Sequence, residues 1–203
     1  MSRRKRKKKK SGCGCSGGIA LFFLLVITTL VLVYSGAVAN IRSYIEHQMY
    51  PLQYKEYILL AAEKYDFEPE FICAVIHTES KFRADAESPA GARGLMQLMP
   101  ETYGEIAYRK GDDVELENML VPQISIDYGV SYLRYLADTC NYGDIYTACA
   151  AYNAGPGNVN RWLESEEYSY DGITLHSTPY KETTQYMERI RKAQDMYAKL
   201  YFE

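Results

Sequence analysis

The stretch that decides the fold is PEFICAVIHTES, residues 69–80. Its residues from Phe71 to Ile76 are all apolar, which predicts a strongly buried helix. Pro69 suits the first turn of such a helix, where a missing N–H leaves no partner unsatisfied. A segment rich in Ser, Pro, Gly and Ala follows at 81–100 and predicts a loop. Glu79 is therefore expected where a buried helix meets a loop.

The rest of the chain beyond residue 51 also favours helices. They are predicted at 52–65, 100–108, 122–139, 145–152, 159–163 and 180–201. The stretch 164–179 is polar and irregular, and no segment shows a convincing strand pattern or an internal repeat. The sequence thus predicts an all-α fold class, with one domain of about 150 residues.

The formal net charge of −3 over 203 residues hides two opposite parts. The first ten residues hold eight Arg and Lys side chains and no acid, so they carry +8. The later residues hold 15 basic and 26 acidic side chains, so they carry −11. Between Ser11 and Ile41 there is no charged residue. This division indicates two electrostatically distinct parts joined by an apolar segment.

That segment is predicted to cross a membrane. Gly17–Ala39 is dominated by Leu, Val, Ile, Phe and Ala, and about 20 such residues span the hydrocarbon core as a helix. The positive-inside rule places the basic tail in the cytoplasm and the chain from Asn40 outside. The basic run therefore indicates topology rather than nucleic-acid binding, and a simple cytosolic enzyme is excluded.

The predicted organisation is a basic cytoplasmic tail at 1–16, a transmembrane signal-anchor at 17–39, a stalk at 40–51 and a folded domain at 52–203. An alternative stays open for the apolar segment. Ala37-Val38-Ala39 fits a small-x-small cleavage pattern, so cleavage after Ala39 would release the domain from the cell membrane.

Three cysteines lie beyond the apolar segment, and an odd number argues against a full disulfide framework. Cys73 is expected to be a buried thiol. Cys140 and Cys149 either pair or remain two reduced, buried thiols. No His or Cys spacing is typical of a metal site, so neither a metal nor another cofactor is predicted.

Glu79 is the first candidate for chemistry. A carboxyl group at the end of a buried helix loses contact with water, which favours the neutral form and raises its pKa. A general acid that works near neutral pH needs such a pKa. The alternative, on this pattern alone, is a glutamate that points into solvent.

Three further blocks bear on this choice. ESKF at 79–82 is followed by SPAGARGLMQLMPET at 88–102, AYNAGPG at 151–157 and ETTQY at 182–186. In this order the blocks resemble the signature of the soluble-lytic-transglycosylase (SLT) domain family, over roughly 52–200. The segment 121–129 resembles the family's central helix, although Ser125 stands where the family commonly has Asn. The resemblance implies a lysozyme-like helical fold and makes 52–203 an SLT-like catalytic domain.

It also implies a reaction. Lytic transglycosylases cleave the β-1,4 bond between N-acetylmuramic acid (MurNAc) and N-acetylglucosamine (GlcNAc) in peptidoglycan. Glu79 matches the family's single catalytic acid and base, which protonates the leaving oxygen and then takes the proton of the muramoyl C6 hydroxyl. That hydroxyl attacks C1 and closes a 1,6-anhydro ring. Ordinary glycosidases use a pair of carboxylates instead.

The resemblance further implies a set of substrate-binding positions, each of which has a plainer structural alternative as a loop, cap, core or surface residue. They are Ser88, Gln97, Met99, Tyr152, Asn153, Glu182 and Tyr186. Tyr152 matches a tyrosine whose hydroxyl lies close to the catalytic acid, and it is expected to orient Glu79 or support developing positive charge.

The expected function is therefore that of a membrane-anchored peptidoglycan lytic transglycosylase that remodels or degrades the cell wall. Its expected partners are peptidoglycan glycan strands and, through 17–39, the membrane, with no nucleic acid. Two alternatives stay open. One is a hydrolytic muramidase on the same fold, and the other is a wall-binding module of a secretion, conjugation or spore-envelope assembly.

Overall fold

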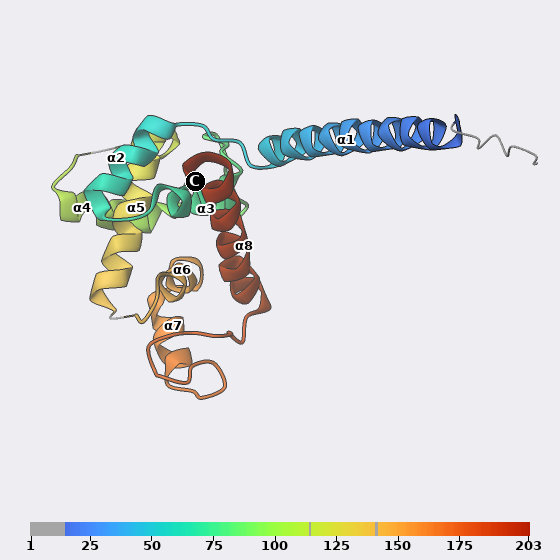
Figure 1. The fold of residues 1–203 in the computed structure, drawn as a ribbon. Coiled ribbons are helices and arrows are strands. Elements are labelled where there is room, and N and C mark those ends of the chain that lie inside the picture. Colours follow the sequence, from blue (N-terminus) through green and yellow to red (C-terminus); the bar gives the residue numbers. More distant parts are fainter. Residues whose placement is uncertain (1–14, 114, 141) are drawn as a thin grey trace, which may run out of the picture. The chain divides into compact units, whose positions relative to one another are not determined.

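The structure is a computed structural model that describes residues 15–113, 115–140 and 142–203 (Figure 1). Within these residues every regular element is a helix, which confirms the predicted all-α fold class. The elements in chain order are α1 (Cys15–Met49), α2 (Lys55–Tyr65), α3 (Pro69–Ser80), α4 (Pro100–Lys110), η1 (Leu116–Leu120), α5 (Pro122–Thr139), α6 (Ile145–Ala154), α7 (Pro156–Leu163), α8 (Lys181–Tyr197) and η2 (Ala198–Phe202).

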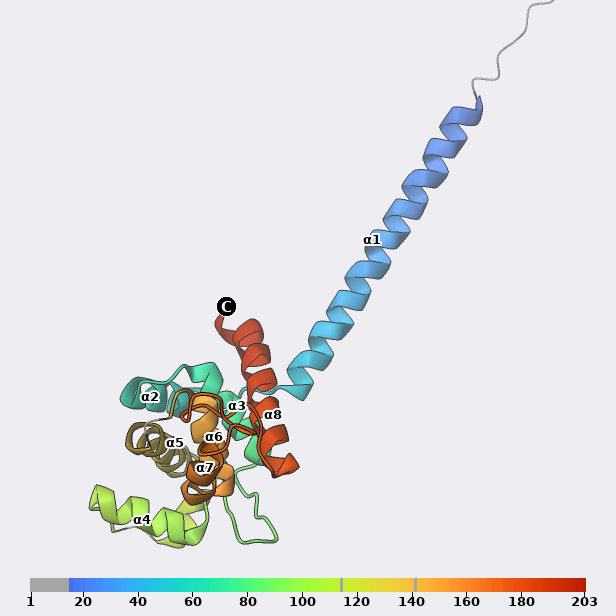
Figure 2. The same cartoon turned by 90° about the horizontal axis from the view of Figure 1, so that it is seen from below.

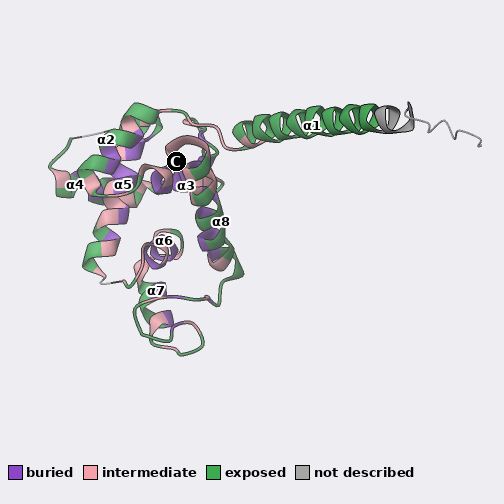
Figure 3. Cartoon of the chain, viewed as in Figure 1, coloured by how far each residue is buried: buried purple, intermediate pink, exposed green. Residues whose placement is uncertain are grey.

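The first compact unit, residues 1–49, contains α1. Its apolar side chains from Leu21 onward are exposed (Figure 3). Leu21–Met49 is the one helix among the described residues that is long and apolar enough to cross a membrane. The helix continues past Ala39 to Met49, so most of the predicted stalk is helical. The basic run at the start of the chain lies outside the described residues.

The second compact unit is residues 50–203. Its first residues are held by the C-terminal helices. The Tyr197 hydroxyl donates to the Pro51 carbonyl at 3.0 Å, and the Tyr201 hydroxyl donates to the Tyr50 carbonyl at 2.8 Å. The fold of this unit therefore already includes the residues that directly follow α1.

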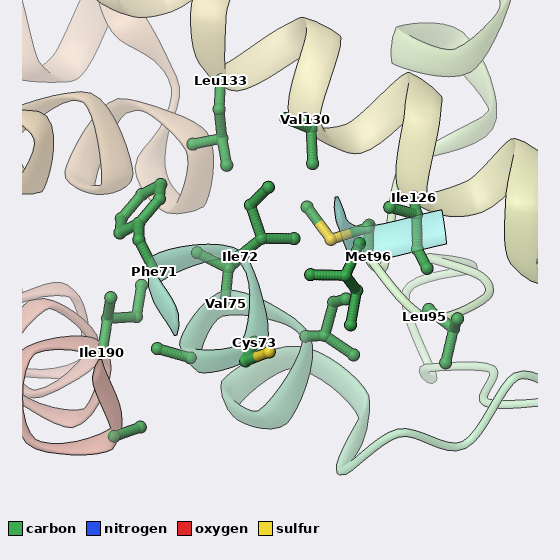
Figure 4. Close-up of a cluster of buried hydrophobic side chains, with 14 of the residues drawn as sticks. Phe71, Ile72, Cys73, Val75, Leu95, Met96, Ile126, Val130, Leu133 and Ile190 are labelled. Carbon is green, nitrogen blue, oxygen red and sulfur yellow. The ribbon is translucent and has the colours of Figure 1, made fainter. Parts of the chain in front are cut away.

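Helix α3 lies at the centre of the main core. Its residues Phe71–Ile76 are almost completely buried, as their unbroken apolar run predicts. Figure 4 shows Val130 and Leu133 from α5 facing Ile72 and its neighbours in α3. Leu95 and Met96, from the loop before α4, also pack into this core (Figure 4). The loop that follows Glu79 is thereby fastened to the same core as the helix that carries it.

Helices α3, α8 and α6 pack in succession beside the main core. Helix α8 packs along α3, and the two run side by side in Figures 1 and 2. Helix α6 packs against α8 as well, and it is rich in small residues that allow close approach. It starts at Asp144, whose carboxylate accepts from the Thr147 N–H at 2.7 Å, as expected of a capping aspartate.

The structure differs from the predicted helices at several boundaries, and two of these differences have a clear physical reason. The short helix η1 at 116–120 was not predicted, because five residues are too few to establish a periodicity. Helix α7 begins at Pro156 rather than at Val159. Gly155, with φ +86°, ends α6 and lets Pro156 take the first position of the new helix, so the two helices meet at one residue.

Candidate active site

Glu79 lies in the last turn of α3, as predicted. The helix ends at Lys81, a left-handed residue with φ 55°, whose N–H donates to the His77 carbonyl at 3.2 Å. Burial among the surrounding side chains raises the pKa of Glu79 from 4.5 to about 7. The Tyr186 hydroxyl and the positive charge of Arg189 act in the opposite direction and lower the pKa. Burial has the larger effect, so a large fraction of the carboxyl groups is protonated at neutral pH.

Tyr186 of α8 makes the direct contact with this carboxyl group. Its side chain is buried, and its hydroxyl donates a hydrogen bond to Oε1 of Glu79. Because α8 packs along α3, this hydrogen bond joins the two helices at the level of the candidate catalytic residue. Burial and the nearby Glu79 charge hold the pKa of Tyr186 well above its usual value, so Tyr186 stays a hydrogen-bond donor.

Tyr152 of α6 is close to Glu79 but does not make this hydrogen bond. Its hydroxyl donates to the Met96 carbonyl at 2.7 Å. The Glu79 charge contributes to raising the pKa of Tyr152, which places the phenol in the same buried environment. The structure therefore assigns the orienting contact to Tyr186, and Tyr152 instead fastens the loop beside the site.

The loop between α3 and α4 is folded by its own hydrogen bonds. The Gly94 N–H donates to the Ala86 carbonyl at 2.9 Å. Gln97 was expected as a polar group that lines the site, but its Nε2 donates to the carbonyls of Ala86 and Gly94 at 3.1 and 2.9 Å. Its φ of 46° is left-handed, which turns the side chain back into the loop. The amide nitrogen of Gln97 therefore stabilises the loop.

Ser88 lies within this loop, and Met99 is its last residue. The Ser88 hydroxyl oxygen accepts from the Ala92 N–H at 3.0 Å, and its hydroxyl hydrogen is left to donate elsewhere. Met99 precedes α4 and leaves 37% of its surface exposed. Both positions are accessible in part, which is compatible with the substrate-binding roles expected of them.

Ser125 anchors the loop from α5. It is buried, and its Oγ accepts from the Met96 N–H at 3.3 Å. The backbone of Met96 is thus bonded to two helices. Its N–H donates to Ser125 of α5, and its carbonyl accepts from Tyr152 of α6. Ser125 stands where the family commonly has Asn, and here this shorter side chain makes the hydrogen bond to the loop. A buried backbone N–H needs such a partner.

Asn153 lies at the end of α6, and Glu182 lies at the start of α8. The Asn153 side-chain oxygen accepts from the Thr183 hydroxyl at 2.9 Å, which ties the end of α6 to α8. Glu182 is exposed in the first turn of α8. It precedes Tyr186 by four residues, so the two share one face of the helix. Glu79, Tyr152 and Tyr186 therefore lie close together where α3 packs against α8. Glu182 lies on the same face of α8 as Tyr186.

Sequence reasoning did not identify two groups near Glu79. Arg189 shares a helix face with Tyr186 at a spacing of three residues, and that spacing was the available signal. Cys149 is fully buried, and the Glu79 charge contributes to raising its pKa, so it stays a neutral thiol. Cys140 and Cys149 are both free thiols in the structure, as is Cys73, which is buried as expected.

A cavity of about 530 Å³ lies elsewhere, between α2 and α5. It is lined by Tyr57, Leu60, Ala61, Lys64, Asp112, Gln123, Ile124, Asp127 and Tyr128. None of the predicted site residues contributes to it. The Asp127 carboxylate within it is already paired, because it accepts hydrogen bonds from Lys64, Tyr65 and Lys110.

The raised pKa of Glu79 predicts how any acid-catalysed reaction at this site depends on pH. The protonated form is half populated near pH 7 and falls about tenfold for each further pH unit, so the acid step is expected to slow in the same proportion. The rate of product release measured from pH 5 to 9 checks this. A rate that stays flat up to pH 9 would contradict the assignment of Glu79 as the acid.

Comparison with known proteins supports the same assignment of family. The family model described as the transglycosylase SLT domain matches residues 56–172. The soluble lytic murein transglycosylase of Salmonella typhimurium is 32% identical over 146 residues, which cover 70% of this chain and 22% of that protein. The membrane-bound lytic murein transglycosylase C of Actinobacillus pleuropneumoniae is 31% identical over 168 residues, which cover 71% of this chain and 46% of that protein.

Solved structures of lytic transglycosylases are similar to this chain as well. An inactive mutant of the lytic transglycosylase Slt from Pseudomonas aeruginosa has a TM-score of 0.65 and 31% identity, covering 74% of this chain and 24% of that one. The 70-kDa soluble lytic transglycosylase of Escherichia coli has a TM-score of 0.68 and 26% identity, covering 78% and 26%. This chain therefore spans less than half the length of these relatives. Over the part that it shares with them, it has the predicted lysozyme-like fold, and it belongs to the transglycosylase SLT domain family.

Proposed function

We propose that this chain is a lytic transglycosylase that cleaves the MurNAc-β-1,4-GlcNAc bond of peptidoglycan and leaves 1,6-anhydro-MurNAc ends. The observation that carries the proposal is the state of Glu79. Its carboxyl group is largely removed from water, its pKa is raised to about 7, and it accepts a hydrogen bond from Tyr186. A carboxyl group in this state can both give and take a proton near neutral pH, as the reaction requires.

The reaction uses one carboxyl group twice. Protonated Glu79 gives its proton to the bridging oxygen as the bond from C1 to that oxygen breaks. The muramoyl C6 hydroxyl then attacks C1 and transfers its proton to the Glu79 carboxylate, which restores the starting state. No water is consumed. Tyr186 keeps Oε1 oriented through both transfers, because its hydroxyl stays protonated.

The environment of Glu79 favours this route over a mechanism with paired carboxylates. Among the described residues, the groups that shift the pKa of Glu79 apart from burial are Tyr186 and Arg189. No second carboxylate in the described part of the chain shifts that pKa, whereas two carboxylates that share a site raise one pKa strongly. The relatives described above are named lytic murein transglycosylases, and these names do not favour a hydrolytic muramidase or a wall-binding module.

The anchor belongs to the same proposal. Helix α1 is long and apolar enough to span a bilayer, and one group of relatives is named as membrane-bound. We propose the organisation expected from the sequence, with the tail 1–16 in the cytoplasm, 17–39 across the membrane and 52–203 outside. Because α1 runs unbroken through Ala39 to Met49, we favour an uncleaved anchor.

The direct test is lysis of purified peptidoglycan. The full-length chain in detergent is incubated with isolated sacculi, and the fall in turbidity and the release of soluble muropeptides are measured. The proposal predicts both. Sacculi that differ in chemical composition are tested in turn. A folded chain that releases muropeptides from none of them would contradict the proposal.

Replacing Tyr186 with Phe tests the orienting contact. The hydroxyl lowers the pKa of Glu79, so its removal is expected to raise that pKa and move the alkaline limb of the pH profile to higher pH. The rate at pH 6 is expected to fall by about tenfold, because the carboxyl group loses its fixed orientation. The ring and its packing remain. A variant with an unshifted pH profile would show that the hydrogen bond does not act on Glu79.

A further inference from the structure

Tyr180 is a half-exposed aromatic residue held in a fixed position. It directly precedes α8 and leaves 53% of its surface open to solvent. Its ring meets Trp162 of α7 nearly at right angles, with centroids 5.1 Å apart and planes at 80°. Trp162 itself is only 7% exposed. The buried indole therefore supports Tyr180 while much of the Tyr180 ring remains available to a ligand.

The backbone at Tyr180 is also fixed. Its carbonyl accepts from the Thr178 hydroxyl at 2.7 Å and from the Thr184 N–H at 3.1 Å. The Thr184 hydroxyl in turn accepts from the Thr178 N–H at 3.0 Å. A ligand that packs on this ring does not have to order it first, and preorganised groups lose little entropy on binding.

Tyr180 directly precedes α8, the helix that carries Tyr186. It precedes Tyr186 by six residues, which is about 9 Å along a helix axis. Glu182 lies between them, and Thr183 carries the hydrogen bond to Asn153. Figures 1 and 2 show that the long loop from α7 returns here to the start of α8. A polymer bound at Glu79 that follows α8 toward its first turn would next meet Tyr180.

We propose that Tyr180, supported by Trp162, is a stacking platform for a further sugar ring of the glycan strand cut at Glu79. The flat face of a pyranose ring presents C–H groups that pack on an aromatic face, while its hydroxyl and acetamido groups stay in water. The domain is strongly acidic overall, so general electrostatic attraction cannot hold an anionic wall polymer. Ring stacking supplies affinity without charge. The proposal rests on the proposed function, because that function identifies the strand.

Binding is measured apart from cleavage in the Glu79→Gln variant of the full-length chain. Trp162 is the single tryptophan, so its fluorescence reports directly on the platform. Glycan strands freed of peptides and of graded length serve as the probe. We expect a fluorescence change that saturates with long strands and is absent with a disaccharide. Co-sedimentation measures the binding of long strands independently. If the Glu79→Gln chain binds them and the fluorescence of Trp162 does not change, the proposal is overturned.

Substitutions of Tyr180 separate the ring face from the hydroxyl. Combined with Glu79→Gln, Tyr180→Ala is expected to raise the dissociation constant for long strands about five- to tenfold and leave that for short ones unchanged. Tyr180→Phe keeps the ring and is expected to retain the affinity. Tyr170→Ala is the matched control, because Tyr170 is 84% exposed in the same segment but stacks on His176, with ring centroids 4.1 Å apart, rather than on Trp162.

The outcomes distinguish this proposal from the proposed function. Equal binding by the Tyr180→Ala and Tyr170→Ala variants would overturn the platform while leaving catalysis at Glu79 intact. A wild-type chain that binds strands through Tyr180 but forms no anhydro ends would support the platform and contradict the proposed reaction. The melting temperature of each variant verifies that it is folded. Each Tyr variant is also made in the chain that retains Glu79, and its cleavage of short strands is measured as a function of pH.

Discussion

Replacing Glu79 with Gln is expected to lower the rate of glycan cleavage by a factor of about 10³ or more. The amide has nearly the same shape, but it cannot give a proton to the leaving oxygen or take one from the C6 hydroxyl, and one such transfer alone contributes about 10²–10⁴. Release of soluble muropeptides from sacculi measures the effect. A variant with more than a tenth of the wild-type rate would contradict the role of Glu79.

The same substitution provides a check on folding, because the raised pKa is also a statement about stability. The stability associated with neutral Glu79 is fully present below its ordinary pKa of 4.5 and is lost as the pH rises through the folded-state value of about 7. Glutamine does not ionise. The Glu79→Gln chain is therefore expected to be at least as stable as the wild type at pH 8, so a loss of activity there does not reflect unfolding.

Replacing Gly94 with Ala is expected to destabilise the domain by about 3–4 kcal/mol. A Cβ atom at this position would lie 2.1 Å from the Met119 carbonyl oxygen and 2.7 Å from the Ser125 Oγ. The φ of +76° is also strained for any residue with a side chain. Since the first of these atoms belongs to the backbone, it cannot rotate away. Urea unfolding followed by Trp162 fluorescence measures the loss.

Gly91 is the matched control in the same loop. Its φ is +91°, but a Cβ atom there would meet nothing within 4 Å. Gly91→Ala therefore isolates the cost of the backbone conformation, which is about 1 kcal/mol. The Gly94 variant is also expected to lose activity, because a shift of Ser125 would disturb the hydrogen bond that its Oγ accepts from the Met96 N–H. Equal losses of stability in the two variants would show that crowding at Gly94 is unimportant.

The sequence was sufficient for all the helices except the short η1, because their signals are local. The apolar run from Phe71 to Ile76 predicts a buried helix, and Pro69, Pro100 and Pro122 begin helices where prolines are tolerated. The position of Glu79 at the end of α3 follows from the same pattern. Its raised pKa was also expected, since it depends on burial that an apolar helix makes predictable.

The contacts between distant segments could not be read from these patterns. Tyr152 and Tyr186 both stand in motif blocks, yet only the three-dimensional packing decides that Tyr186 reaches Glu79 and that Tyr152 reaches Met96. Gln97 is a similar case, because a left-handed backbone angle turns its amide into the loop. The ring contact between Trp162 and Tyr180 spans a segment without any regular pattern, so no periodicity points to it.

The measurement that tests the central claim most directly is the chemistry of the newly formed ends. Sacculi are digested by the full-length chain in water enriched in ¹⁸O, and the released muropeptides are weighed by mass spectrometry. Intramolecular attack by the C6 hydroxyl predicts anhydro ends that are lighter by one water and contain no ¹⁸O, and the Glu79→Gln chain is expected to form none. Reducing ends that carry ¹⁸O as the sole product would contradict the account and identify the enzyme as a hydrolase.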